Sequence, residues 1–439
     1  MKIAAAALTA MLVHTPAAQA VTLAAPVTLA TTDVTFTTPD GQRLGGRIFR
    51  PAKATGMLPG VLLVHGSGGG NRWQELEDEA RAFAEQGLVV LAPDKRSAGY
   101  TKTRRDYSQL ADDALAAFEV LRKQPSVGKA GLWGISEGGW VAPIAANRGT
   151  GIDFLVTVGG PGWTPLRTQS WNAANKVDRA GVQGSLRRVY AGTFHRLAAD
   201  AGLFAAAYYD PEPQLRGLKQ PVLAMWGGAD NQVPPAESAE RFRALVTAPL
   251  TVKFFPGANH SLHREGSGLV PGYADAMGSW VRSVAAGEVP AASAEPYPVQ
   301  ETRSADVPES AWWESWQLHV GAMLAFLLAG LAYGVLRRLG PGSWPARIVA
   351  IAAPLSIAGF VATLFTMLLS SSAVGVETGP MLLGRPVLWL AAQLLAAVTG
   401  VAAVAALTQW RTASRRVRMI AVAGAVYVPW AVYWGLLLP

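Results

Sequence analysis

Cysteine is absent from the 439 residues of this chain. Its absence excludes disulfide bonds, a thiolate nucleophile and cysteine-based metal sites. Histidine is scarce, so each of its six copies can be considered in turn as a catalytic base. Charged residues are also few, at 15% of the chain against 50% hydrophobic residues, a balance typical of proteins with membrane-spanning segments.

Acidic residues are nearly missing from the last part of the chain. From Gln317 onward there are eight arginines and one glutamate, so most of the net charge of +8 lies in this part. These arginines fall in loops between apolar runs rather than forming a basic surface for nucleic acid. We therefore expect an integral membrane protein with no nucleic-acid partner.

The stretch around Ser136 has the composition of a catalytic turn. An apolar run at residues 130–134 predicts a buried strand, and residues 140–146 predict a packed helix. Between them, Gly134-Ile135-Ser136-Glu137-Gly138 has the Gly-x-Ser-x-Gly spacing of a nucleophile elbow. A serine at a helix N-terminus lies where the helix dipole and free N–H groups favour developing negative charge. We predict that Ser136 is a nucleophile.

A serine nucleophile needs a base and a carboxylate that orients the base. His260 directly follows a strand-like run at residues 250–255 and a turn, and we favour it over His263, three residues further on. Asp230 follows the buried strand pattern of residues 221–226, at the strand end where sites form in open α/β sheets. The alternative for Asp230 is a cap on the next helix. The order Ser136, Asp230, His260 matches the Ser-Asp-His order of α/β-hydrolases.

On these motifs, residues 34–286 resemble the α/β-hydrolase superfamily. The runs His65-Gly66-Ser67-Gly68-Gly69 and Gly134–Gly139 are similar to those of its esterase, dienelactone-hydrolase-like and acyl-thioesterase branch. Dienelactone hydrolases have a cysteine where this chain has Ser136. The resemblance implies a mostly parallel, doubly wound sheet with a helical lid at about residues 161–219. It also implies an oxyanion hole made by the backbone N–H of Glu137 and of Ser67 or Gly68.

The loop Asp94-Lys95-Arg96 resembles the Asp-x-Arg loop of the same superfamily. The resemblance implies that Asp94 and Arg96 order the site through an ion pair. We therefore interpret both as structural residues.

The ends of the chain predict export and membrane insertion. Residues 1–20 are typical of a signal peptide, with Lys2, a short apolar core and the Ala18-Gln19-Ala20 cleavage pattern. The hydrolase domain would then span residues 21–286. Residues 287–316, rich in alanine, proline, serine and glutamate, predict a linker.

Residues 317–439 contain four apolar runs of about 20 residues each, enough to span a bilayer. We expect four transmembrane helices, at residues 317–336, 348–369, 386–407 and 419–438. Arginines fill the first and third loops, so the positive-inside rule places these loops in the cytoplasm and the hydrolase domain on the periplasmic or exterior side. The runs contain no ionisable residue except His319 near one edge, which favours an anchor over a pore or an access route for lipid substrates.

Together these features predict a multi-pass, exported serine hydrolase that cleaves carboxylic esters or thioesters through an acyl-enzyme on Ser136. Such chemistry requires no metal or cofactor. One alternative is a serine peptidase of the prolyl-oligopeptidase type. The other is a non-catalytic binding or sensor module on the same fold.

Overall fold

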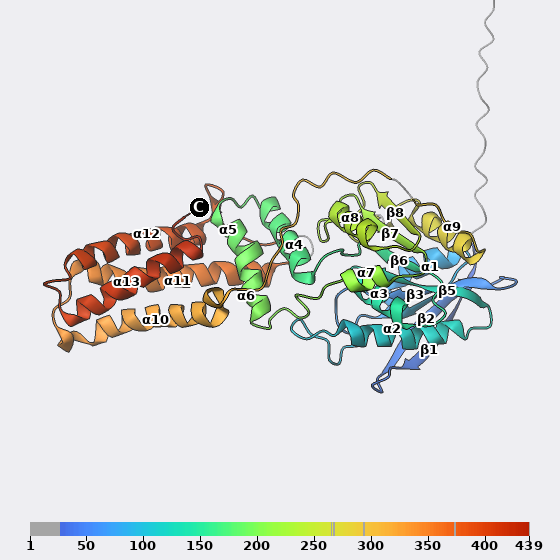
Figure 1. Ribbon diagram of the computed structural model, residues 1–439, viewed down its shortest axis with the longest axis horizontal. Helices are drawn as coiled ribbons and strands as arrows, with labels where there is room; N and C mark the ends of the chain where they lie inside the picture. The colour runs from blue at the N-terminus through green and yellow to red at the C-terminus, as the bar shows by residue number, and fades with distance from the viewer. Residues whose placement is uncertain (1–26, 265, 267, 293–294, 373–374, 439) are drawn as a thin grey trace, which may run out of the picture.

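The computed structural model describes residues 27–264, 266, 268–292, 295–372 and 375–438. The predicted signal peptide, residues 1–20, lies outside the described residues. Figure 1 shows an elongated molecule with an α/β domain at one end, a bundle of long helices at the other and short helices between them.

A sheet of eight strands forms the centre of the α/β domain, in the order β1-β2-β4-β3-β5-β6-β7-β8. All neighbours from β4 to β8 pair in parallel, whereas β1 and β2 form an antiparallel hairpin at one edge. This confirms the expected mostly parallel sheet. The strands are β1 (Leu29–Thr37), β2 (Arg43–Pro51), β3 (Leu58–Val64), β4 (Val89–Pro93), β5 (Val127–Ile135), β6 (Leu155–Val158), β7 (Val222–Gly227) and β8 (Leu250–Phe255).

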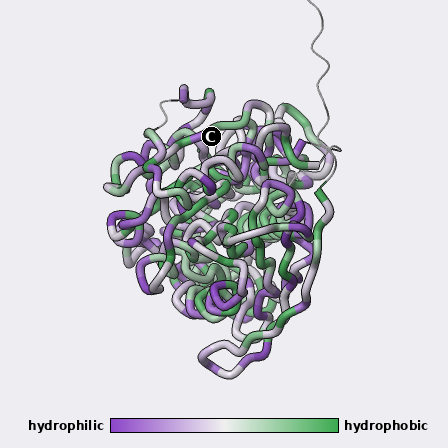
Figure 2. The backbone as a smooth tube through the Cα atoms, turned by 90° about the vertical axis from the view of Figure 1, so that its right-hand side faces the viewer, coloured by the Kyte–Doolittle hydropathy of each residue, from purple (hydrophilic) through white to green (hydrophobic). Residues whose placement is uncertain are grey.

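Helices cover both faces of the sheet and enclose two hydrophobic cores. In β3, Leu62 and Val64 face one core while Val61 and Leu63 face the other, the pattern of a strand buried on both sides. The first core includes side chains of α2 (Tyr107–Arg122), α3 (Gly138–Arg148) and α8 (Pro235–Leu245), and the second those of α1 (Glu77–Glu85) and α9 (Tyr273–Ala285). Figure 2 views the molecule from the end that holds the α/β domain, where hydrophobic segments lie toward the middle and hydrophilic segments lie around them.

Residues 161–219, here called the insertion, join β6 to β7. They contain α4 (Pro165–Arg179), α5 (Ser185–Arg188), η2 (Val189–Phe194), α6 (His195–Asp200) and α7 (Glu212–Gly217). Helices α4, α5 and α6 lie between the α/β domain and the bundle (Figure 1). Side chains of the insertion such as Val177, Leu186 and Tyr190 share one buried core with bundle residues such as Phe360 and Trp430. The insertion is thus packed against the bundle through a continuous apolar interface.

The bundle consists of α10 (Trp316–Val335), α11 (Trp344–Ser370), α12 (Val387–Thr408) and α13 (Arg415–Tyr433). Among the described residues, the helices α10, α11 and α12 are long and apolar enough to cross a membrane. The sequence predicted four such helices, and the described part of the structure contains three. The fourth helix starts before the predicted run, so its first turn contains Arg415, Arg416 and Arg418, and it ends at Tyr433, before the apolar residues 436–438.

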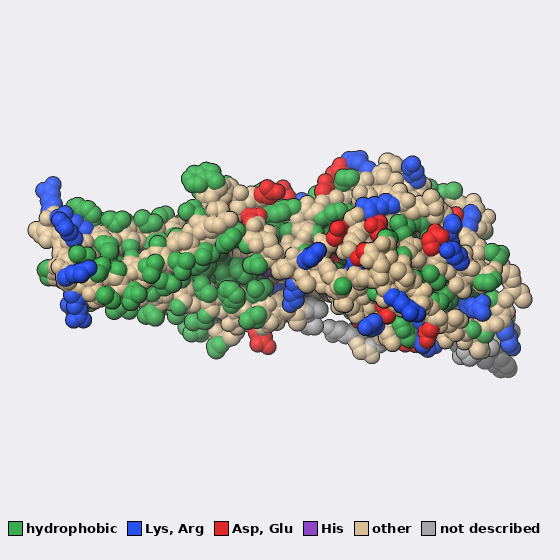
Figure 3. Space-filling view, turned by 90° about the horizontal axis from the view of Figure 1, so that it is seen from below, with side chains coloured by type: hydrophobic (Ala, Val, Ile, Leu, Met, Phe, Trp, Pro, Cys, Tyr) green, Lys and Arg blue, Asp and Glu red, His purple; other side chains and the backbone are tan. Residues whose placement is uncertain are grey.

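The two basic loops of the bundle lie together at its end farthest from the α/β domain. Ser414, in the α12–α13 loop, donates a hydrogen bond of 2.7 Å to the carbonyl oxygen of Pro341, in the α10–α11 loop. Figure 3 shows lysine and arginine side chains gathered at this end and apolar side chains along the bundle. The basic residues are Arg337, Arg338, Arg347, Arg411, Arg415, Arg416 and Arg418.

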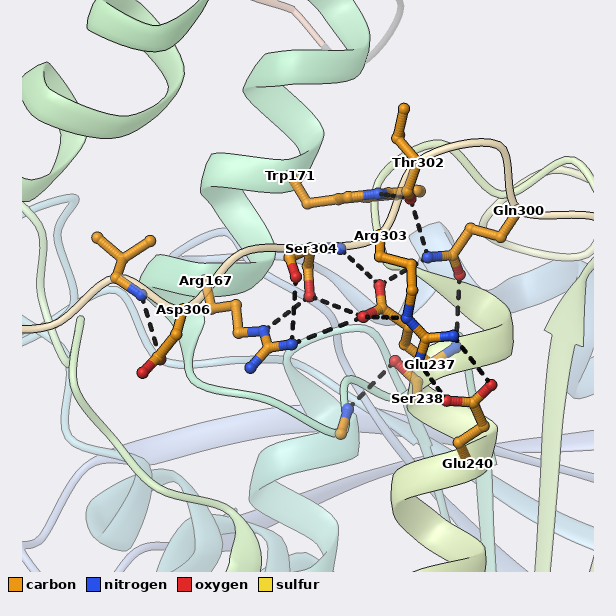
Figure 4. A network of polar contacts seen from close by, with 12 residues as sticks. Arg167, Trp171, Glu237, Ser238, Glu240, Gln300, Thr302, Arg303, Ser304 and Asp306 are labelled. Atoms are coloured by element: carbon orange, nitrogen blue, oxygen red, sulfur yellow. Dashed lines mark hydrogen bonds and ion pairs between the residues drawn. The ribbon is translucent and has the colours of Figure 1, made fainter.

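The predicted linker is attached to the domain rather than free. Up to Ala311 its described residues form no helix or strand, but they make the polar network of Figure 4. The buried Glu237 of α8 accepts hydrogen bonds from the Ser304 N–H at 2.7 Å and from Gln300 Nε2 at 2.6 Å. From α4, Arg167 donates to Ser304 Oγ at 2.7 Å, and Trp171 Nε1 donates to a linker carbonyl at 2.8 Å. The linker therefore ties the insertion to α8.

Candidate active site

Ser136 occupies a sharp turn between β5 and α3. Its φ of 55° lies in the left-handed region that side chains other than glycine rarely adopt. The turn needs glycine on both sides, because a Cβ on Gly134 would lie 2.3 Å from the Gly138 carbonyl oxygen, and one on Gly138 would lie 2.5 Å from that of Val64. The Gly-x-Ser-x-Gly spacing thus has a steric cause, and the turn lifts Ser136 to the N-terminus of α3.

Asp230 and His260 form a buried pair at the ends of neighbouring strands. Asp230 follows β7, His260 follows β8, and Oδ2 of Asp230 lies 2.8 Å from Nδ1 of His260. The other carboxylate oxygen accepts the N–H groups of Gln232 and Val233, at 2.8 and 3.0 Å. A carboxylate only accepts hydrogen bonds, so we assign the imidazole proton to Nδ1 and the lone pair to Nε2. Within the described part of the chain, the buried Nε2 has no hydrogen-bond partner.

Ser136 and His260 each contact the end of β6. The N–H of Ser136 donates to the Val158 carbonyl oxygen at 2.9 Å. The His260 ring lies against the next residue, Gly159, where an added Cβ would be 2.8 Å from ring atoms Cε1 and Nδ1. His263, the alternative base, instead contacts Ser261, with 3.0 Å between Nδ1 and the Ser261 carbonyl oxygen. Of the two histidines, His260 is therefore the one paired with Asp230.

Of the candidate oxyanion donors, two have free N–H groups and one does not. The loop after β3 runs beside the turn, since a Cβ on Gly66 would lie 3.4 Å from Ser136 Cβ. Among the described residues, the N–H groups of Ser67 and Glu137 have no acceptor. The N–H of Gly68, however, donates to Tyr100 Oη at 2.9 Å. The expectation that Gly68 could serve as a donor is therefore corrected in favour of Ser67, because the Gly68 N–H is already bonded.

The side chain of Glu137 anchors the start of α3 in a buried charge cluster. Its carboxylate lies 2.6 Å from Lys95 Nζ and 2.8 Å from Arg105 Nη1, and both oxygens lie 3.0 Å from Tyr100 Oη. Burial lowers the pKa of the Lys95 ammonium, and the Glu137 charge opposes that shift. Burial also raises the pKa of Tyr100, which therefore stays a neutral hydroxyl that donates to the carboxylate.

Sequence reasoning missed this cluster. It assigned the ordering role in the loop after β4 to Asp94 and Arg96, which bind elsewhere: Asp94 accepts from Arg72 at 3.0 Å, and Arg96 pairs with Asp40 and Asp113. Lys95, between them, is the residue that reaches the turn. The available signal was a lysine two residues after a buried strand, at the same sheet edge as the serine.

A cavity of about 790 Å³ opens at Ser136. At this end it is lined by Ser67, Ser136, Glu137 and Trp140, and it continues past the insertion to residues of α10 and α11. Its size is that of a pocket for a drug-sized or larger ligand. The described residues include no group of three or more His, Asp or Glu side chains placed to hold a metal ion.

Residues 61–271 match the model of the alpha/beta hydrolase family. The esterase EstD of Thermotoga maritima is 27% identical over 211 residues, which are 43% of this chain and 50% of that protein. The polyketide transferase claH of Penicillium crustosum is 34% identical over 132 residues, 29% of this chain and 43% of that protein. The chain thus spans half or less of the length of these two relatives.

Solved structures of similar fold include a dienelactone hydrolase from Anabaena variabilis, with 19% identity and a TM-score of 0.38. The match covers 60% of this chain and 99% of that one. The esterase Pf2001 of Pyrococcus furiosus has 18% identity and a TM-score of 0.41, over 60% of this chain and 92% of its own.

Proposed function

We propose that this chain, whose residues 61–271 belong to the alpha/beta hydrolase family, is a membrane-bound serine hydrolase acting on carboxylic esters or thioesters. The observation that carries the proposal is the Asp230–His260 pair: its Nε2 has no hydrogen-bond partner among the described residues, and its ring, like Ser136, lies at the end of β6. The relative named as an esterase supports ester bonds as the substrate class.

In the proposed mechanism, His260 Nε2 takes the proton of Ser136 as Oγ attacks the carbonyl carbon. Asp230 holds the imidazole in the required tautomer and stabilises the imidazolium. The N–H groups of Glu137 and Ser67 donate to the oxyanion of the tetrahedral intermediate. The imidazolium then protonates the leaving alcohol or thiol, and an ester on Ser136 remains. A water molecule that gives its proton to His260 hydrolyses this ester, and the acid departs.

The proposal also specifies on which side of the membrane the α/β domain lies. The basic loops of the bundle lie at the end away from the α/β domain, the arrangement that the positive-inside rule gives when the hydrolase is outside the cytoplasm. The signal-peptide pattern of residues 1–20 favours the same orientation. We propose that the α/β domain is exported and that the bundle holds it at the membrane.

The cavity favours an ester over a peptide substrate. A peptidase that recognises a free N-terminus needs an unpaired carboxylate in its site. Among the described residues that line the cavity, Glu137 is the only acidic one, and its carboxylate is paired with Lys95 and Arg105.

The test uses the full chain reconstituted in lipid nanodiscs. We expect hydrolysis of p-nitrophenyl esters and labelling by a fluorophosphonate, with turnover falling at least about 10³-fold in Ser136→Ala and in His260→Ala. His263→Ala is the matched control and should retain activity. Equal hydrolysis or labelling of wild type and Ser136→Ala would refute the proposal, and so would a complete lack of labelling in wild type.

A further inference from the structure

The cavity at Ser136 does not end within the α/β domain. It passes the insertion residues Tyr190 and Leu197 and reaches α10 and α11, two of the helices able to cross a membrane. On α11 its lining extends from Phe360 to Leu368, which corresponds to about 12 Å along the helix axis. This length is roughly two-fifths of the thickness of a bilayer's hydrocarbon core.

The lining changes in character along the cavity. Near the turn it includes the polar and basic side chains of Ser67, Lys102 and Arg105. Along α10 and α11 the lining is mostly apolar, although it includes His319: its apolar side chains there are Val320, Met323, Val361, Leu364, Phe365 and Leu368. Such a gradient fits an amphiphile whose reactive group lies at Ser136 and whose tail lies between the helices.

Several side chains at the apolar end of the cavity are exposed. Val320, Phe365 and Leu368 line the cavity and are 39%, 52% and 42% exposed. Apolar side chains run along the bundle in the view of Figure 3. In a membrane, a tail could pass between α10 and α11 without crossing water.

Specific contacts hold the insertion in place over this cavity. Tyr190 Oη donates to the Met367 carbonyl oxygen at 3.2 Å, and Lys176 Nζ donates to Ser371 Oγ at 3.2 Å. Ser185 Oγ donates to the carbonyl oxygen of Gly435 at 2.6 Å, beyond the end of α13. The cavity is therefore built by two parts of the chain that are fixed to each other.

We propose that the substrate is a long-chain acyl ester or thioester resident in the membrane leaflet next to the α/β domain. Its acyl chain enters between α10 and α11 and fills the apolar end of the cavity, and its carbonyl carbon lies at Ser136. The inference rests on the proposed function, because it assumes that Ser136 attacks the carbonyl. It gives the bundle a part in substrate binding in addition to anchoring.

The test is a long-chain alkyl fluorophosphonate that carries a diazirine at the end of its chain, applied to the full protein in nanodiscs. Ser136 Oγ bonds to phosphorus, fluoride leaves, and His260 passes the serine proton to water. Irradiation should then crosslink the chain end to peptides of α10 or α11. Attachment to Ser136 with crosslinks confined to the α/β domain or the insertion would overturn the inference and leave the hydrolase standing. No attachment to Ser136 would instead refute the proposed function.

Val320→Trp provides a second test, with Val401→Trp as its matched control on α12. Val401 is 73% exposed and does not line the cavity. We expect the ratio of palmitoyl to butyryl ester kcat/KM to fall at least about tenfold in Val320→Trp, because the larger side chain blocks the apolar end, and to stay unchanged in Val401→Trp. An unchanged ratio in Val320→Trp would overturn the inference. If that variant fails to fold, the crosslinking experiment on the wild-type protein still tests the inference.

Discussion

Substitution of Glu137 tests how the turn at Ser136 is stabilised. In Glu137→Gln the shape of the side chain is kept, but Lys95 loses its counter-ion while its side chain remains only 7% exposed. Removing one partner of a buried ion pair costs about 3–5 kcal/mol of unfolding free energy. For a domain of this size that loss lowers Tm by roughly 10 °C. An exposed pair should behave differently, so Glu119→Gln, whose partner Arg122 is 41% exposed, should leave Tm nearly unchanged.

The same reasoning predicts a pH dependence. Burial already lowers the pKa of Lys95, and loss of the Glu137 charge lowers it further. Between this folded pKa and the higher unfolded one, the unfolded state binds more protons, so the stability of Glu137→Gln rises with pH relative to that of wild type. The Tm deficit should therefore shrink between pH 7 and pH 10.

The assay is thermal unfolding of the full chain in nanodiscs, followed by tryptophan fluorescence. Adding Lys95→Met to Glu137→Gln removes the buried ammonium and should recover most of the lost Tm. The reasoning would be refuted if Glu137→Gln melted like wild type at pH 7. It would also be refuted if the double variant melted no higher than Glu137→Gln.

Three further predictions concern the site and its supports. Asp230→Asn should lower kcat for esters by about 10⁴-fold, because an amide no longer fixes the imidazole tautomer; loss of less than about tenfold would contradict this role. Gly138→Ala should abolish fluorophosphonate labelling, since its Cβ would lie 2.5 Å from a carbonyl oxygen of β3, whereas Gly192→Ala, with no atom within 4 Å, should label normally. Burial lowers the pKa of His65 from 6.5 to about 4, so the unfolded state binds more protons in this range and stability should fall by about 3 kcal/mol on acidification across it. Unfolding of His65→Asn should show a flatter profile over the same pH range.

The parts of the site that could be predicted are those encoded locally. Ser136, Asp230 and His260 each lie in the turn or loop after a strand with a strong apolar signal, and the carboxyl ends of parallel strands meet at one edge of a sheet. The other strands of the eight-stranded sheet have a local sequence signal of the same kind. Residue spacing along the chain was enough for these features, because each depends on one strand and the turn after it.

The features that could not be predicted depend on contacts between distant segments. The bond between the Gly68 N–H and Tyr100 links two loops and removes a donor that spacing alone left open. Lys95 reaches Glu137 across 42 positions of the sequence. The start of α13 at Arg415 is a third case, since hydropathy marks an apolar run, whereas a helix begins where its first turn is capped, here by Ser414.

Contacts with the insertion give the bundle a structural role in addition to the proposed anchoring role. The insertion side chains Val177, Leu186 and Val189 are fully buried, at 0% exposure, in a core that the insertion shares with the bundle. Burying an aliphatic side chain of this kind contributes about 1.5–3 kcal/mol, so the insertion gains much of its stability from the long helices. The walls of the cavity that opens at Ser136 therefore depend on the bundle. A hydrolase domain cut off before α10 would lose both the apolar end of that cavity and the surface that holds the insertion over the serine.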